Sequence, residues 1–153
     1  MKNILMSGLI VLSLNVGAQA EGLTKIGLGV GVAGSNSALI KLPLDIDDTF
    51  RIEPEFALSS VDFGNGSNDS FSIGSGFYLL NKTSEKTSVY YGGKFVFGDT
   101  NTGSSGSVLS AVGGFEYYLD TKVSLGAEVS FGIGFGSISG YSTNSSVNIR
   151  YYF

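Results

Sequence analysis

Cysteine and histidine are both absent from this chain of 153 residues. Without cysteine no disulfide can stabilise the fold, so its stability must come from the packing and hydrogen bonding of the chain itself. Imidazole and thiolate groups are also the common ligands of transition metals, and histidine is the most frequent general base in enzymes. We therefore expect no catalytic site, no metal site and no cofactor.

Proline is nearly absent as well, with two residues, whereas glycine contributes 23. After Val16 the sequence shows no apolar stripe with the spacing of an amphipathic helix. The chain is rich in serine, threonine and asparagine, and 42% of its residues are hydrophobic. This composition favours many short strands and turns over helices or disorder.

The first 20 residues, MKNILMSGLIVLSLNVGAQA, have the pattern of a secretory signal. Lys2 precedes an apolar run from Ile4 to Val16, and an A-x-A cleavage site follows. The run is shorter than the roughly 20 apolar residues that a membrane-spanning helix needs. We predict a cleaved signal peptide over residues 1–20 and a single barrel domain over residues 21–153. Loss of Lys2 changes the net charge from −4 to −5, which disfavours nucleic acid as a partner.

The mature chain contains eight segments in which apolar and small or polar residues alternate. They cover roughly residues 24–33, 37–46, 49–60, 70–80, 87–98, 107–119, 122–136 and 144–153. A period of two is that of a β-strand, because successive side chains leave opposite faces of the backbone. An even number of such strands, separated by turn-like breaks, predicts an up-and-down antiparallel barrel.

The two faces of these strands differ in a way that separates a membrane barrel from a soluble one. In the seventh segment one face carries Val123, Leu125, Ala127, Val129, Phe131, Ile133 and Phe135, and the other carries Gly126, Glu128, Ser130, Gly132 and Gly134. The large apolar set would overfill a narrow lumen, so we expect it to face lipid and the small and charged set to face inward. A soluble barrel that binds an apolar ligand, as lipocalins do, would instead expose the glycine-rich face to water. The sequence thus predicts an all-β, closed, eight-stranded antiparallel transmembrane β-barrel.

The last eight residues, SVNIRYYF, form an alternating strand that we expect to pair with residues 24–33 and close the barrel. Such a strand, with Tyr151 and a final Phe153, resembles the signal read by the barrel-assembly machinery of Gram-negative bacteria. The stretch GGFEYYLDTKVSLGAEVSF, residues 113–131, resembles the strand, short turn and strand of small outer-membrane barrels. With its eight segments, the sequence is similar to the OmpA-like and OmpX-like barrels of the outer-membrane protein family.

That resemblance implies a location in the Gram-negative outer membrane, contact with membrane lipid and lipopolysaccharide, and recognition by the assembly machinery. It also implies periplasmic termini, with short inner turns at 45–49, 81–86 and 119–122, and outer loops at 34–36, 60–69, 99–106 and 137–143. We expect a monomer whose loops meet an extracellular partner of unknown identity. Phe63 and Tyr141, in the second and fourth loops, are the candidate contacts; they could equally pack at the membrane interface.

The inward face carries charges that nearly balance. The predicted lumen charge network consists of Lys41, Arg51, Lys94 and Arg150 with Glu53, Glu55, Glu116 and Glu128. Folding the turn near 47 is expected to set Lys41 opposite Glu53, and folding the loop near 140 to set Glu128 opposite Arg150. Because an unpaired buried charge costs several kcal/mol, we predict a salt-bridged plug. Pro43 and Pro54 fall within predicted strands, where each removes a ladder hydrogen bond.

Three functional classes follow from this interpretation. The first is a non-enzymatic outer-membrane protein with a structural or surface-interaction role and a plugged lumen. The alternative is a narrow, porin-like channel for ions or small solutes, for which the inward glycines of the first, fourth and seventh segments leave room. An enzyme acting on lipid is disfavoured because no histidine is present, and the basic neighbours of Glu53 and Glu55 favour salt bridges over acid–base chemistry.

Overall fold

The computed structural model describes residues 23–34, 37–62, 67–100 and 105–153. The predicted signal peptide and Phe63 lie outside these ranges. Within them, no helix is long and apolar enough to cross a membrane.

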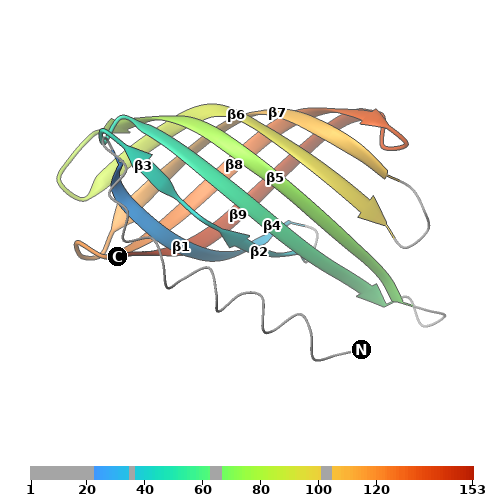
Figure 1. Ribbon diagram of the computed structural model, residues 1–153, viewed down its shortest axis with the longest axis horizontal. Helices are drawn as coiled ribbons and strands as arrows, with labels where there is room; N and C mark the ends of the chain where they lie inside the picture. The colour runs from blue at the N-terminus through green and yellow to red at the C-terminus, as the bar shows by residue number, and fades with distance from the viewer. Residues whose placement is uncertain (1–22, 35–36, 63–66, 101–104) are drawn as a thin grey trace.

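Nine strands build one closed antiparallel sheet (Figure 1). They are β1 (Leu23–Ala33), β2 (Ser37–Lys41), β3 (Leu44–Ile46), β4 (Phe50–Asp62), β5 (Ser67–Lys82), β6 (Thr87–Thr100), β7 (Ser105–Tyr118), β8 (Val123–Gly136) and β9 (Gly140–Tyr152). Sequence neighbours pair from β3 to β9, and β9 pairs with β1 from Gly27↔Tyr152 to Ala33↔Ser146. The C-terminal strand therefore closes the barrel against β1, as its alternation predicts.

Strands β2 and β3 are two pieces of one barrel strand, because both lie between β1 and β4. The break falls at Leu42 and Pro43. Pro43 lies in the break, and Pro54 of β4 lies opposite it. The carbonyl of Pro43 accepts a hydrogen bond from Gly27 N at 2.9 Å, and that of Pro54 accepts one from Leu42 N at 2.9 Å. Pro43 thus lies where the ladder is interrupted. The barrel has eight strands, so the predicted fold class is confirmed.

Two of the cross-strand pairs expected from the sequence differ in the structure, because the turns between their strands are shorter than expected. Lys41 is opposite Glu55, not Glu53, because the turn between β3 and β4 is confined to residues 47–49. Asp47 and Asp48 there adopt the left-handed conformation, with φ of 51° and 54°, which aspartate tolerates better than most residues. Glu128 is opposite Ser146, not Arg150, because the turn between β8 and β9 spans only residues 137–139.

The two ends of the barrel differ. We call the end with the turns 47–49, 83–86 and 119–122 the turn end, and the opposite end the loop end. At the loop end β1 and β2 are separated by 34–36, as the sequence predicts. The other strands are separated by only 63–66, 101–104 and 137–139, whereas the sequence predicts loops over 60–69, 99–106 and 137–143. The strands extend further than expected because serine, asparagine and glycine, which are typical of loops, here continue the strand ladders.

The exterior of the barrel is apolar and the interior is charged. Large exposed hydrophobic side chains on the outer face include Leu28, Val30, Val32, Leu58, Phe71, Ile73, Phe77, Leu79, Tyr91, Phe95, Phe97, Leu109, Phe115, Leu125, Val129, Phe131, Ile133, Phe135, Val147 and Ile149. Nine charged residues of the strands are buried inside, whereas Lys25, Lys82 and Asp99 lie nearer strand ends and are not buried. This is the inverse of a soluble protein, which rarely exposes a contiguous apolar surface of such extent.

Candidate functional site

The candidate site is the set of charged side chains inside the barrel. All eight residues of the predicted network point inward, and each is at most 9% exposed. Their strands place them there by alternation: Arg51, Glu53 and Glu55 are every second residue of β4, and β8 and β9 contribute Glu128 and Arg150. Asp45, 2% exposed, joins them from β3. These nine residues are the charge network of the described structure.

Arg51 organises the part of the network nearest the turn end. Its Nη2 lies 3.0 Å from Asp45 Oδ2 and its Nη1 lies 2.9 Å from Glu116 Oε2. Nη2 also donates to the Tyr152 hydroxyl at 2.8 Å, and that hydroxyl donates to Glu116 Oε1 at 2.6 Å. Ser124 Oγ donates to the same oxygen of Glu116. Charge-assisted bonds of this kind are stronger than neutral ones.

Arg150 and Glu53 form the centre of the network. Arg150 Nε lies 2.9 Å from Glu53 Oε2, and Arg150 Nη2 lies 3.2 Å from Glu53 Oε1, so the pair is bidentate. Arg150 Nη1 is 3.8 Å from Glu116 Oε1, which connects the centre to the turn-end part. The ring of Tyr90 lies 5.5 Å from the guanidinium carbon of Arg150, within the range of a cation–π contact.

Two lysines and two glutamates form the part nearest the loop end. Lys41 Nζ lies 3.0 Å from Glu53 Oε1 and 3.0 Å from Glu128 Oε2. Lys94 Nζ lies 2.9 Å from Glu128 Oε1 and 3.3 Å from Glu55 Oε1. Glu53 and Glu128 thus each bind two cations, and Glu53 joins the loop-end part to the centre because it binds both Lys41 and Arg150.

The ion pairs form one connected chain across the lumen. Four cationic and five anionic side chains take part, and each makes at least one ion pair within 4.0 Å. Pairing of this completeness is required because removing a charge from water costs several kcal/mol unless it is compensated. The carboxylates are therefore occupied by lysine and arginine partners, which leaves little room for acid–base chemistry.

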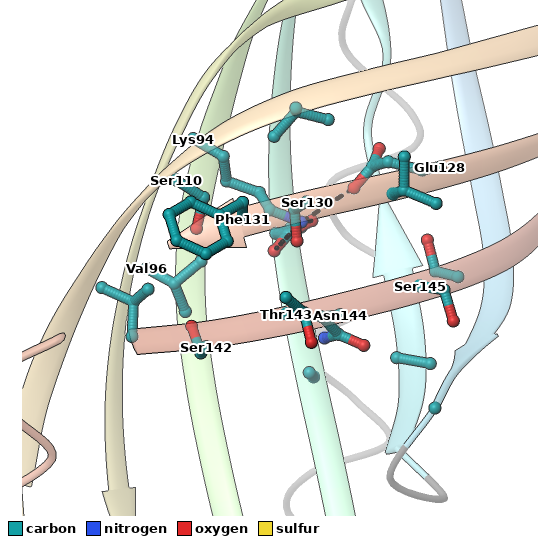
Figure 2. Close-up of a pocket in the computed structure, with 18 of the residues that line it drawn as sticks. Lys94, Val96, Ser110, Glu128, Ser130, Phe131, Ser142, Thr143, Asn144 and Ser145 are labelled. Atoms are coloured by element: carbon teal, nitrogen blue, oxygen red, sulfur yellow. Dashed lines mark hydrogen bonds and ion pairs between the residues drawn. The ribbon is translucent and has the colours of Figure 1, made fainter. Parts of the chain in front are cut away.

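Cavities lie on both sides of the network. At the loop end a cavity of about 1020 Å³ has Glu55, Lys94 and Glu128 among its lining residues (Figure 2). At the turn end a smaller cavity of about 400 Å³ is lined by Lys25, Asp45 and neighbouring turn residues. Since network residues line both cavities, the network separates them.

Sequence reasoning missed several members of the site. The sequence places Asp45 both at the end of the segment 37–46 and in the turn 45–49, and the predicted network omits it, although it shares the parity of Lys41 and so belongs to the inward face. Tyr152 shares the parity of Arg150, but nothing in the sequence shows that its hydroxyl joins Arg51 and Glu116. The expected pair of Glu128 and Arg150 is wrong, because the register gives Glu128 to the two lysines and Arg150 to Glu53.

The remaining candidate residues lie on the outer face. Tyr141, near the loop end, is 81% exposed, and its ring stacks on that of Phe131 with centroids 6.0 Å apart. Tyr151 and Phe153 lie at the turn end with ring centroids 5.5 Å apart. Phe153 N donates to Ile26 O at 2.9 Å, which ties the final residue to β1.

No protein-family model and no curated protein sequence matches this chain. Its fold does match solved structures. Neisserial surface protein A has a TM-score of 0.63 at 17% identity, over 84% of this chain and 95% of that one. The N-terminal β-barrel domain of Pseudomonas aeruginosa OprF has a TM-score of 0.60 at 9% identity, over 84% and 96%. The Yersinia pestis outer membrane protein Ail, in a nanodisc, has a TM-score of 0.58 at 13% identity, over 84% and 99%. The chain has the fold of small outer-membrane β-barrels.

Proposed function

We propose that this protein is a non-enzymatic integral outer-membrane β-barrel with a structural or surface-interaction role, whose lumen is plugged by paired charges. The observation that carries the proposal is the connected chain of ion pairs between two cavities, inside a barrel with an apolar exterior. Charges sealed inside and hydrocarbon outside are the distribution expected for a barrel in lipid.

Insertion into the outer membrane is supported by the outer face. Its exposed Val, Leu, Ile and Phe side chains would be unfavourable in water but suit contact with membrane lipid and lipopolysaccharide. The predicted signal peptide would bring the chain to the periplasm, and the strand ending in Tyr151 and Phe153 would be read by the barrel-assembly machinery. A similar fold occurs in the Yersinia pestis outer membrane protein Ail, in Neisserial surface protein A and in the N-terminal β-barrel domain of Pseudomonas aeruginosa OprF.

A surface role would be carried by the loop end. The strands at that end extend into the segments where the sequence predicts loops. The ends of the strands, including Tyr141, therefore form much of the accessible surface. Polar tips on a rigid barrel are a common arrangement for binding a partner. Phe63 belongs to the same end by sequence and stays a candidate contact.

The absence of cysteine allows the orientation to be tested by single-site labelling. Ser139→Cys lies in the β8–β9 turn at the loop end, and the control Glu85→Cys lies in the turn between β5 and β6. We expect a maleimide on a polymer too large for porins to label Ser139→Cys on intact cells, and Glu85→Cys only after the outer membrane is opened. Labelling of Glu85→Cys alone on intact cells would contradict a surface role for the loop end.

A narrow channel for ions or small solutes is the second candidate function. It is favoured by the loop-end cavity, whose inner wall reaches the network at Glu55, Lys94 and Glu128. Conduction would require the network to open a path between the two cavities. Single-channel recording separates the two functions.

A further inference from the structure

The loop-end cavity differs chemically from the network beneath it. Its inward-facing wall combines hydroxyl groups with small aliphatic side chains, such as Ser110, Ser130, Val108 and Val112. Its size is close to that of pockets that enclose small ligands, roughly 300–1,000 Å³. The wall above the network carries no charge, so a ligand there would be met by neutral hydroxyls and methyl groups.

At the loop end, the described part of β1 ends before its neighbour β9 does, so the barrel wall is shorter on that side of β9. Pairing between β1 and β9 ends at Ala33↔Ser146, followed by a hydrogen bond from Gly34 N to Ser145 O at 3.0 Å. Strand β9 nevertheless continues to Gly140, paired only with β8 over that stretch. Figure 1 shows the hairpin of β1 and β2 ending short of β4 and β5. Above this hairpin, one side of β9 is left without a strand neighbour among the described residues.

The residues that line the cavity are not all on the inner face of the barrel. Besides inward residues, it is lined by residues of the outer face of β7, β8 and β9: Ala111, Gly113, Val129, Phe131, Thr143 and Ser145. They are cross-strand neighbours of one another, as in Gly113↔Val129 and Val129↔Ser145. Because β7, β8 and β9 are hydrogen-bonded to each other without a break, a passage between the inner and the outer lining residues would run around the uncovered side of β9. Figure 2 shows Ser142 to Ser145 along this strand.

The outer part is a shallow groove in the apolar surface. Gly113 forms its base, and a Cβ placed there would meet no atom within 4 Å. The exposed side chains of Phe131 and Val129 flank it. The groove thus has the shape and polarity to hold a hydrocarbon chain, and it leads to a polar cavity.

A buried hydroxyl inside the cavity has no partner among the described residues. Ser146 is 8% exposed and lines the cavity, and its Oγ is covered and makes no hydrogen bond to a described residue, so rotation of this side chain would be needed to present the hydroxyl to a ligand. A buried polar group left unpaired costs about 1–3 kcal/mol, so a ligand that offers it a hydrogen bond would bind favourably. Ser146 lies opposite Glu128, at the base of the cavity.

From these observations we propose that the cavity and groove bind a single-chain amphiphile with an uncharged, hydroxyl-bearing head, such as a monoacylglycerol. The head would enter the lumen beside β9 and bond to Ser146 and the neighbouring serines, and the chain would lie in the groove over Gly113. An anionic head is disfavoured because Glu55 and Glu128 lie at the base and the ammonium of Lys94 is already bound to both. The proposal rests on the membrane location proposed above.

The test uses the intact protein in phospholipid vesicles and a monoacylglycerol with a photoreactive diazirine near the end of its chain. After illumination, mass spectrometry maps the modified residues. We expect modification of the β7–β9 groove to exceed that of the outer face of β4–β6 about tenfold, which corresponds to a preference of 1.4 kcal/mol. A fatty-acid anion and a two-chain phospholipid with the same group should show no such enrichment.

Two variants, each with a matched control, make the test specific. Gly113→Leu fills open space, so it should fold normally and abolish the enrichment, whereas Ala38→Leu, on the outer face of β2 and outside the cavity, should not. Ser146→Ala should lower the enrichment several-fold, with Ser107→Ala as its matched control. An even distribution over the apolar face, or equal enrichment of the phospholipid or the fatty acid, overturns the proposed ligand. Absence of modification anywhere on the outer face would instead overturn the membrane location, and this proposal with it.

Discussion

Lys41 and Glu128 are 87 residues apart in the sequence, and Lys41 Nζ lies 3.0 Å from Glu128 Oε2 inside the barrel. One comes from β2 and the other from β8, which are not neighbours in the sheet. A bond between them therefore crosses the lumen. The pair shows that the inward charges connect strands on different sides of the barrel.

Glu53 should be among the residues most sensitive to substitution, since it binds both Lys41 and Arg150. We expect Glu53→Gln to lower the free energy of unfolding by about 3–5 kcal/mol, the usual cost of removing one partner of a buried ion pair. Urea unfolding of the protein refolded into vesicles measures this. A double-mutant cycle with Arg150→Met should show strong coupling, and additive effects would contradict the pairing.

Two adjacent tyrosines provide a matched comparison of the inner and outer faces. The Tyr152 hydroxyl bonds to Arg51 and Glu116, whereas Tyr151 points outward and is 43% exposed. We predict that Tyr152→Phe lowers the unfolding free energy by about 1–3 kcal/mol, because Arg51 and Glu116 each lose a hydrogen bond to the Tyr152 hydroxyl. Tyr151→Phe should change it by less than about 0.5 kcal/mol. Equal effects in the same unfolding assay would refute the assignment of faces.

Glycines of the barrel wall divide into those that are required and those that are not. A Cβ on Gly92 would lie 1.9 Å from Phe77 O, but one on Gly113 would meet open space. Gly92→Ala should destabilise the protein by roughly 1–3 kcal/mol through overpacking. Gly113→Ala should be neutral or stabilise it by up to about 1 kcal/mol. Thermal unfolding of the two variants side by side decides this, and a neutral Gly92→Ala would count against the β5–β6 register.

The terminal Phe153 provides a test of the assembly signal that is independent of stability. Its main-chain N–H bonds to Ile26 O and its side chain is 73% exposed, so Phe153→Ala should keep the barrel fold, and unfolding in vesicles measures any loss of lipid or Tyr151 contact separately. In cells we expect the variant to accumulate less in the outer membrane than the wild type, while both refold equally well from urea into vesicles. Equal accumulation in cells would show that Phe153 does not contribute to recognition by the assembly machinery.

Much of this architecture could be predicted from alternation alone. A period of two assigned Glu53, Lys94 and Arg150 to the inner face, and the apolar character of the other face predicted a membrane barrel. The register of the strands was harder to predict, because a turn that is a few residues shorter than expected changes the partner of every residue in the two strands. Glu128, which is opposite Ser146, is an example. Contacts across the lumen, such as Lys41 with Glu128, depend on barrel diameter and strand tilt, which no local pattern encodes.

The strand interruption at Leu42 and Pro43 was only partly foreseen. Proline in a strand indicates irregular pairing, but the sequence does not show that its carbonyl would bond to Gly27. Likewise the low wall beside β9 follows from strand lengths that differ by several residues. Such differences arise where polar residues such as Ser142 and Asn144 continue a ladder instead of forming a loop.

The central claim is that paired charges close the lumen, and single-channel recording of the refolded mature protein in a planar lipid bilayer tests it most directly. Glu128→Gln, which weakens the bonds to Lys41 and Lys94, is compared with Val129→Ala on the outer face of the same strand. We predict that the wild type and Val129→Ala are silent and that Glu128→Gln shows openings. Steady conductance of the wild type would contradict the plug and identify the protein as a narrow pore.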